Sequence, residues 1–375
     1  MQPVLVLYAS LGGGHKAAAL ALAEVGRARG REVELIDALS LAPHWFARAY
    51  VESYLVSTGF ARSLYGATFS ATDHRDPVRD AVRAVLDRSV GGELVAHVLD
   101  RRPAAVIATH FYPLVELGRL RRSAALDVPL IAVVTDYVAH ALWAVPDVDL
   151  YCAPRGRAVE DLASLGVARS AIVETGIPVS RAFGAAAPWV EPGPGEPMRV
   201  LVTSGGFGVG PVLDVLRSFR GVSGVALDVV SGDRPALVAR ANKLVARHNL
   251  VATVTGFATD MPQRIGQAHV VIGKAGGLTM SECLASGRPL VVVGAGPGQE
   301  AGNVEVLEAW GAGIHAHARK VGPLVRALAD DGALRAMASE ARAHGAADAA
   351  TRIWDLVDAR TAASIWPAGC NEPPV

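Results

Sequence analysis

A histidine that follows three consecutive glycines is the feature of this sequence that most directly indicates chemistry. Gly12, Gly13 and Gly14 precede His15, and an alanine-rich stretch with helical periodicity begins directly after them. Glycines let a ligand approach the backbone, and the free N–H groups of a helix start favour an anion. An imidazole has a suitable pKa for a general base near neutral pH. His15 is therefore a candidate base, and a histidine that only begins a helix is the alternative.

Asp136 follows another apolar segment of the first half of the chain. Because the carboxyl ends of parallel strands meet at one edge of a sheet, its carboxylate is a candidate to orient the His15 imidazole and to stabilise its charged form. A plain cap at the end of a strand is the alternative.

The second half of the chain contains a similar glycine-rich turn. Residues 203–211 read TSGGFGVGP, and Pro211 suits the first turn of a helix. Such a turn can hold a diphosphate through backbone N–H groups and a helix dipole, without a metal ion. The alternative is a tight connection between a strand and a helix.

Two further segments of the second half carry polar side chains at expected helix starts. Residues 273–284 read GKAGGLTMSECL and residues 294–303 read GAGPGQEAGN. Glu282 is placed to accept hydrogen bonds from ribose hydroxyls, although a solvated carboxylate favoured by the helix dipole is the alternative. Lys274 has the alternative of a surface lysine. A polar cluster able to bind sugar hydroxyls consists of Gln299, Glu300 and Asn303.

The elements that must position these residues are short strands. Runs rich in Val, Ile and Leu alternate with helical stretches and lack polar alternation, which is typical of parallel strands covered on both faces. This predicts an α/β protein with two doubly wound parallel sheets. The expected strands are 4–8, 33–36, 105–109, 130–135, 150–152 and 171–175 in the first half, and 199–203, 226–230, 252–255, 270–272, 290–293 and 313–315 in the second.

The prolines and glycines of the segment AAAPWVEPGPGEP, residues 185–197, break both periodicities and predict a linker. An N-terminal domain of residues 1–184 and a C-terminal domain of residues 198–345 then face each other across a cleft, where open α/β sheets bind ligands. Residues 346–365 are expected to form a helix that packs back on the first domain. Residues 366–375 read as a tail.

Composition excludes several classes of function. Lys plus Arg and Asp plus Glu both number 36, so the net charge is zero and no basic field attracts nucleic acid. The three cysteines lie far apart, which predicts neither a metal site nor disulfides and fits a reducing cytosol. No apolar run reaches the roughly 18 residues that a membrane span requires, and no signal peptide is recognisable. Any membrane role would be peripheral.

An aromatic segment is a candidate for such peripheral binding. Residues 43–69 hold seven aromatics, beginning with Trp45, out of 8 Phe, 7 Tyr and 6 Trp in the chain. Phe46, Tyr50 and Tyr54 recur every four residues on one helical face, and arginines lie nearby, as in interfacial segments that meet anionic headgroups. An ordinary core helix with surface arginines is the alternative.

Seven motifs together resemble the monogalactosyldiacylglycerol synthase and processive diacylglycerol glucosyltransferase family, a MurG-like group of inverting glycosyltransferases with the GT-B fold. The resemblance covers nearly the whole chain. Ala275 stands where the bacterial pattern often has proline, which affects turn rigidity more than chemistry. The motifs are GGGHxxAA at 12–19, THxxP at 109–113, VTDYxxHxxW at 134–143, TGIPV at 175–179, GGxGxGP at 205–211, GKAGGLTMSECLASGRP at 273–289 and PGQExxN at 297–303.

The resemblance implies a role for each of these segments. His15, with Gly13 and Gly14, would lie near the acceptor hydroxyl, and Glu282 would hold the ribose. The route from the bilayer would be lined by His110, His140 and Trp143, and simple packing of the His-x-x-Trp pair is the alternative. The diphosphate would be flanked by Gly205, Gly206, Phe207 and Gly208, and the uracil by Gly256 and Phe257. The rest of the donor site would comprise Lys274, Gly276, Gly277, Leu278 and Thr279, with Gln299, Glu300 and Asn303 at the hexose.

The function expected from this resemblance is transfer of a hexose from a UDP-sugar to diacylglycerol in an anionic membrane surface, on the cytoplasmic face of the cell membrane. No cofactor, metal or nucleic acid is expected. Three alternatives stay open: a MurG-like transferase with a polyprenyl-linked acceptor, a sugar-nucleotide 2-epimerase and a non-enzymatic UDP-sugar sensor. The identity of the hexose, processivity and the oligomeric state do not follow from the sequence.

Overall fold

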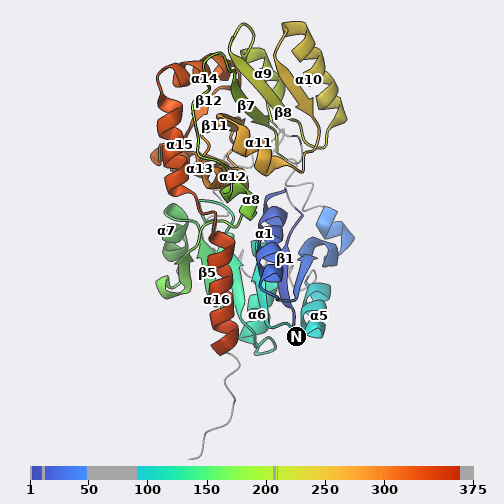
Figure 1. The fold of residues 1–375 in the computed structure, drawn as a ribbon. Coiled ribbons are helices and arrows are strands. Elements are labelled where there is room, and N and C mark those ends of the chain that lie inside the picture. The colour runs from blue at the N-terminus through green and yellow to red at the C-terminus, as the bar shows by residue number, and fades with distance from the viewer. Residues whose placement is uncertain are drawn as a thin grey trace, which may run out of the picture.

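Two parallel sheets of six strands each form the protein (Figure 1). The structure, a computed structural model, describes residues 2–10, 13–48, 91–205, 208, 210–296 and 298–363. The strand order is β2-β1-β3-β4-β5-β6 in the first sheet and β12-β11-β10-β7-β8-β9 in the second, and all pairs are parallel. The strands are β1 (Val4–Tyr8), β2 (Val33–Asp37), β3 (Ala105–Ala108), β4 (Leu130–Val133), β5 (Leu150–Ala153), β6 (Ile172–Glu174), β7 (Met198–Thr203), β8 (Val225–Val230), β9 (Ala252–Thr255), β10 (Val270–Gly273), β11 (Leu290–Val293) and β12 (Gly313–Ala316).

Helices cover both faces of each sheet, which confirms the doubly wound α/β fold predicted from the sequence. All twelve expected strands are present and differ from the expected bounds only at their ends. The helices are α1 (Gly14–Ala28), α5 (Gly92–Arg101), α6 (Phe111–Arg122), α7 (Arg157–Ser164), α8 (Arg181–Gly184), α9 (Val212–Ser218), α10 (Pro235–His248), α11 (Met261–Gln267), α12 (Gly277–Ser286), α13 (Gln299–Ala309), α14 (Val321–Asp330), α15 (Ala333–His344) and α16 (Ala349–Ala363), with short 3-10 helices at Ala38–Leu41, Ala141–Trp143, Arg169–Ala171 and Ala318–Lys320.

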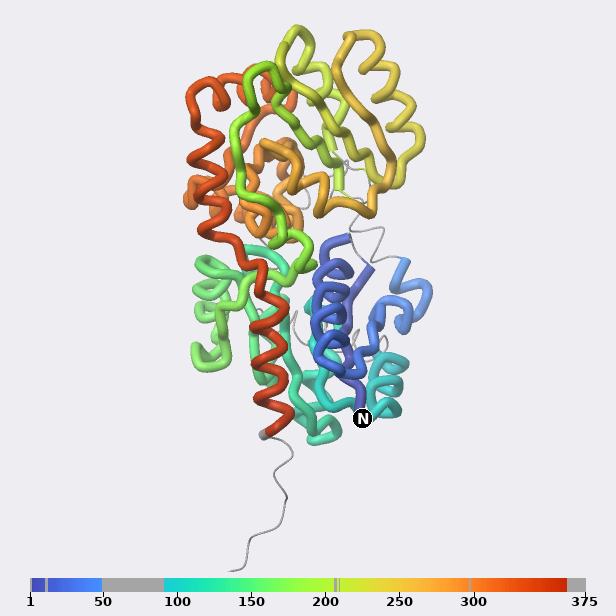
Figure 2. The backbone as a smooth tube through the Cα atoms, in the orientation of Figure 1, coloured from blue at the N-terminus to red at the C-terminus, as the bar shows by residue number. Residues whose placement is uncertain are grey.

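The C-terminal helix α16 returns from the second domain and lies along the first, beside α1 (Figure 2). The Trp354 side chain is fully buried there, and its indole N–H donates to the Leu22 carbonyl oxygen at 2.7 Å. Gly26 makes room for the ring, since a Cβ at this position would lie 2.2 Å from it. On the surface, Arg29 pairs with Asp355 at 2.7 Å. Residues 185–197, which contain no helix or strand, form the other connection between the sheets.

The two domains also meet at the carboxyl ends of their strands. The first turn of α12 packs so closely on the chain that follows β4 that a Cβ at Gly277 would lie 2.0 Å from the Thr135 carbonyl oxygen. A Cβ at Gly14, at the start of α1, would lie 3.5 Å from the Leu278 side chain of the same turn. The residues with candidate chemistry in both halves are therefore brought to one interface.

Candidate functional site

His15 is the second residue of α1 and is half-buried where the two domains meet. Its Nδ1 lies 2.9 Å from the Thr109 carbonyl oxygen and 3.0 Å from Thr135 Oγ1. A carbonyl oxygen can only accept, so Nδ1 carries the proton and Nε2 keeps its lone pair. This tautomer is the one that can accept a proton at Nε2. The Thr109 hydroxyl also donates to the His15 carbonyl oxygen at 2.9 Å and holds the helix start.

The surroundings of His15 keep its imidazole neutral. Burial lowers the pKa of His15 to about 4, against the opposing effect of the Thr109 hydrogen bond. The ring of His110 stands edge-on to it, with ring centroids 4.5 Å apart, and burial together with His15 lowers the pKa of His110 well below its ordinary value. At neutral pH His15 is therefore in the form that a general base requires.

Asp136, expected to orient the His15 imidazole, makes its hydrogen bonds with the second domain instead. Its Oδ1 accepts from Asn303 Nδ2 at 3.1 Å, and its carboxylate accepts the Gly277 N–H. Thr135, directly before it, is the residue whose side chain contacts His15. The orienting group is the Thr109 carbonyl, which corrects the prediction. Burial, supported by the nearby Glu300, raises the pKa of Asp136 to about 7.

Asn303, expected at the hexose, is fully buried at the domain interface. Its Nδ2 donates both hydrogens, to Asp136 Oδ1 and at 2.8 Å to the Ala275 carbonyl oxygen. Its Oδ1 accepts the Tyr137 N–H at 2.8 Å. The amide thus has no hydrogen left for a sugar hydroxyl. The Asn303 side chain therefore serves the contact between the domains, and its approach to the hexose stays a prediction.

Glu282, Lys274 and Glu300 lie in the second domain beside this interface. Burial raises the pKa of the half-buried Glu282 to about 8, and none of the residues that the structure describes hydrogen-bonds its carboxyl group. Lys274 Nζ lies 2.6 Å from Glu300 Oε1, and Glu300 Oε2 accepts the Gly296 N–H at 2.6 Å. Gln299 is the first residue of α13, and Glu300 follows it. Glu282 is thus available to a ligand, whereas Glu300 already has protein partners.

The remaining donor-side residues lie in turns that follow strands of the second sheet. Gly205 and Gly208 have φ angles of 71° and 64°, a region that favours glycine. Gly206 and Phe207 lie outside the described residues. Phe257 follows β9 and is 67% exposed, so its ring face is open to a base. Gly256 precedes it, and Gly276 and the half-buried Thr279 belong to the start of α12.

The expected acceptor-side residues divide into exposed and buried groups. Trp45 is 62% exposed, whereas Phe46 packs on the core and stacks on Tyr112 with ring centroids 5.6 Å apart. Tyr50 and Tyr54 lie outside the described residues. Gly13 is exposed, directly before α1.

His140 and Trp143, expected along a lipid route, are buried inside the first domain. His140 Nδ1 accepts the Leu142 N–H and begins a 3-10 helix, and Trp143 packs on the edge of Phe111. Their spacing serves packing rather than an open path, which corrects the prediction. His110 is also buried, but it contacts His15 directly.

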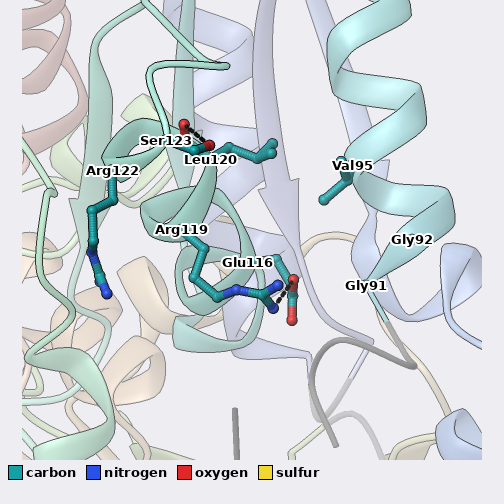
Figure 3. A pocket seen from close by; sticks show the side chains of 8 residues that line it. All are labelled: Gly91, Gly92, Val95, Glu116, Arg119, Leu120, Arg122 and Ser123. Carbon is teal, nitrogen blue, oxygen red and sulfur yellow. Dashed lines mark hydrogen bonds and ion pairs between the residues drawn. The ribbon is translucent and has the colours of Figure 1, made fainter. Parts of the chain in front are cut away.

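A cavity of about 580 Å³ lies between the start of α5 and the second half of α6 (Figure 3). Glu116 and Arg119 point toward each other beside it and are 2.9 Å apart. His110, whose ring contacts that of His15, stands at the opposite end of α6. The cavity is therefore separate from the His15 site.

Thr109 and Thr135 are the functional residues that the sequence interpretation missed. Each is the first polar residue after a buried strand and precedes a residue that attracted attention, His110 or Asp136. Their position directly after a buried strand was the feature of the sequence that could have identified them. Among the described residues, no group of His, Cys, Asp and Glu side chains could hold a metal ion. None of the described helices is long and apolar enough to cross a membrane.

Comparison with known proteins agrees with this architecture. The chain is similar to MurG of Acinetobacter baumannii, with a TM-score of 0.64, 19% identity and coverage of 96% of this chain and 100% of that one. The co-structure of S. aureus MnaA with UDP gives a TM-score of 0.62 at 16% identity and covers both chains fully. The two facing parallel sheets and these neighbours define the GT-B fold of glycosyltransferases.

Two family models match separate parts of the chain. Residues 15–179 match the family model of monogalactosyldiacylglycerol (MGDG) synthase, and residues 227–353 match the C-terminal domain of glycosyltransferase family 28. The processive diacylglycerol beta-glucosyltransferase of Bacillus cereus strain B4264 is 26% identical over 328 residues, which is 83% of this chain and 81% of that protein. These matches agree with the resemblance to MGDG synthases and processive diacylglycerol glucosyltransferases that the motifs predicted.

Proposed function

We propose that this chain is an inverting hexosyltransferase that moves a hexose from a UDP-sugar to diacylglycerol at a membrane surface. The observation that carries the proposal is the hydrogen bond from His15 Nδ1 to the Thr109 carbonyl oxygen, because it leaves Nε2 as a proton acceptor at the domain interface. The matches to the MGDG synthase model and to a diacylglycerol glucosyltransferase support diacylglycerol as the acceptor, and the UDP co-structure of MnaA supports a UDP-linked donor.

In the proposed mechanism, His15 Nε2 takes the proton of the acceptor hydroxyl as that oxygen attacks the anomeric carbon. The bond to the diphosphate oxygen breaks on the opposite face, so the anomeric configuration inverts. The sugar develops positive charge and the diphosphate leaves with the bonding electrons. In the proposal, the N–H groups at the first turns of α12 and α13 stabilise that charge, and no step needs a metal ion.

On the donor side, the proposal assigns the ribose to Glu282. Its carboxyl group is half-buried and has no hydrogen-bond partner among the described residues, so two ribose hydroxyls would satisfy it. The exposed ring of Phe257 would stack on the uracil, and Gly205 and Gly208 would border the diphosphate. Gln299, together with the Lys274–Glu300 ion pair, would border the hexose.

On the acceptor side, the proposal places the first domain on the inner face of the cell membrane as a peripheral protein. The exposed Trp45 is an indole of the kind that sits at membrane interfaces. The match of residues 15–179 to MGDG synthase supports a diacylglycerol-type lipid as the acceptor.

A 2-epimerase would need a free carboxyl pair as acid and base. Asp136 and Glu300 are close enough to interact electrostatically, but both are engaged, Asp136 by Asn303 and Glu300 by Lys274. The geometry therefore favours transfer over epimerisation.

The test is to incubate the protein with UDP-glucose or UDP-galactose and liposomes that contain diacylglycerol, and to analyse the lipids by mass spectrometry for added hexose and by NMR for the anomeric configuration. A diacylglycerol that has gained one hexose in the β configuration supports the proposal. Transfer only to a polyprenyl-linked acceptor, epimerisation of UDP-N-acetylglucosamine without an acceptor, or UDP-sugar binding without turnover would each replace it with one of the alternatives.

A further inference from the structure

Three consecutive residues after β4 connect His15 with both helices of the donor side. Thr135 contacts the His15 imidazole, and the next two residues contact α12 and α13. The Ser281 hydroxyl donates to the Gly277 carbonyl oxygen at 2.7 Å, so the Tyr137 hydroxyl is the donor in their 2.8 Å hydrogen bond. Residues 135–137 thus lie between the proposed base and the proposed donor site.

The Asn303 amide is the centre of this contact. It joins three separate pieces of chain: its own helix α13, the segment 136–137 of the first domain, and Ala275 just before α12. Asn303 stands one helical turn after Gln299 and Glu300, the residues proposed at the hexose. The buried Asn303 side chain therefore fixes the position of α12 and α13 relative to the segment after β4. This is the segment whose Thr135 contacts His15.

We propose that Asp136 and Asn303 are positioning residues for sugar transfer, whose hydrogen bond sets the distance between the His15 base and the bound nucleotide sugar. The inference rests on the proposed function for its chemistry, and on the domain contact alone for its geometry. It assigns to Asn303 a role that does not involve the sugar.

The hydrogen bonds of Asn303 indicate a specific contact between the domains rather than simple packing. Loss of the Asn303 side chain would leave the buried Tyr137 N–H without its acceptor and the Ala275 carbonyl without its donor. Such unsatisfied buried groups are costly, so the segments would move apart or admit water. A displacement of about 1 Å at a reacting centre is enough to reduce turnover on the order of 100-fold.

The charge on Asp136 is part of this contact. It faces the Gly277 N–H of α12, the Asn303 amide and Glu300 of α13, and beyond Glu300 its ion-pair partner Lys274. The ionised carboxylate is the better acceptor for the two N–H groups, whereas burial and Glu300 oppose ionisation. Because its pKa is near neutrality, the contact strengthens as the pH rises through that range.

The experiment compares Asn303→Ala, Asp136→Asn and the control Asn242→Ala, which alters an exposed asparagine of α10. Hexose transfer is measured with UDP-glucose and UDP-galactose, UDP binding by calorimetry, and backbone exposure by hydrogen exchange. For Asn303→Ala we expect kcat to fall on the order of 100-fold for both donors, with the Kd for UDP unchanged within about threefold. The Tyr137 amide should exchange faster. Asp136→Asn keeps an oxygen for Asn303, and it should keep most of its kcat but lose the pH dependence near 7.

The outcomes separate this inference from the proposed function. A change in the preference between the two sugars, or a rise in donor KM without a fall in kcat, would show that Asn303 contacts the hexose and would overturn the inference. Unchanged kcat and unchanged Tyr137 exchange would also overturn it. If the wild-type protein transfers no sugar, the proposed function fails, whereas faster Tyr137 exchange in Asn303→Ala alone would still support the domain contact.

Discussion

Replacement of Glu282 by glutamine should make the protein more stable in alkaline solution. A free glutamate has a pKa of about 4.3, and burial raises the pKa of Glu282 to about 8. A folded-state pKa that is raised in this way means that the folded protein prefers the neutral carboxyl group. The stability that this group contributes is complete below pH 4.3 and is lost as the pH rises through about 8.

The size of the effect follows from the difference between the two pKa values. At about 1.4 kcal/mol per pH unit it amounts to about 5 kcal/mol. Part of it is already lost at pH 5, and Glu282 is only half-buried, so solvent screening reduces the value further. We expect a gain of roughly 2 to 4 kcal/mol for Glu282→Gln at pH 9 relative to pH 5. Glutamine has nearly the same shape and no charge.

The assay is urea unfolding of the wild-type protein and Glu282→Gln at pH 5 and pH 9, with the free energy of unfolding extrapolated to water. Glu24→Gln, on the exposed face of α1, is the matched control and should show no such pH-dependent gain. If wild type and Glu282→Gln lose the same stability between the two pH values, the carboxyl group is not held in a desolvated environment. The proposal that Glu282 binds the ribose through a buried, unpaired carboxyl group would then lose its support.

Three further predictions concern the base and the domain contacts. In protein with isotope-labelled histidine, the NMR signals of the His15 ring should stay at their neutral values from pH 8 down to about 5.5, because its pKa is lowered to about 4; titration near 6.5 would contradict the geometry. Gly277→Ala should reduce kcat on the order of 100-fold, since its Cβ would meet the Thr135 carbonyl at 2.0 Å; wild-type kinetics would argue against the close contact. Trp354→Ala should lower the free energy of unfolding by about 3 to 5 kcal/mol, while an unchanged urea midpoint would show that α16 is not docked on α1.

The fold was predictable because its strands are uninterrupted apolar runs. β1 and β11 begin and end at the expected residues, since each is a buried apolar run that directly follows a proline. The error at β4 is informative. The apolar pattern predicted a strand to residue 135, but β4 ends at Val133 and Thr135 turns to contact His15. The local pattern of apolar residues cannot show where a residue leaves the hydrogen bonds of the sheet to make a tertiary contact.

The sequence predicted which loops form the candidate site, but not which side chains hydrogen-bond to one another within it. The strand ends placed His15 and Asp136 at one edge, and both are found there. Which side chain meets the imidazole depends on the direction of each side chain after the strand ends. The burial of Asn303 depends on how the second domain docks against the first, which no spacing within α13 encodes.

His15 supplies the most direct test of the account as a whole. Wild type, His15→Ala and His15→Gln are compared for transfer of hexose from UDP-sugar to diacylglycerol in liposomes, and for UDP binding by calorimetry. The account predicts a loss of kcat of about 100-fold or more in both variants, with the Kd for UDP within about threefold of wild type. Wild-type turnover in either variant would contradict it, because Nε2 would then not be the group that takes the acceptor proton.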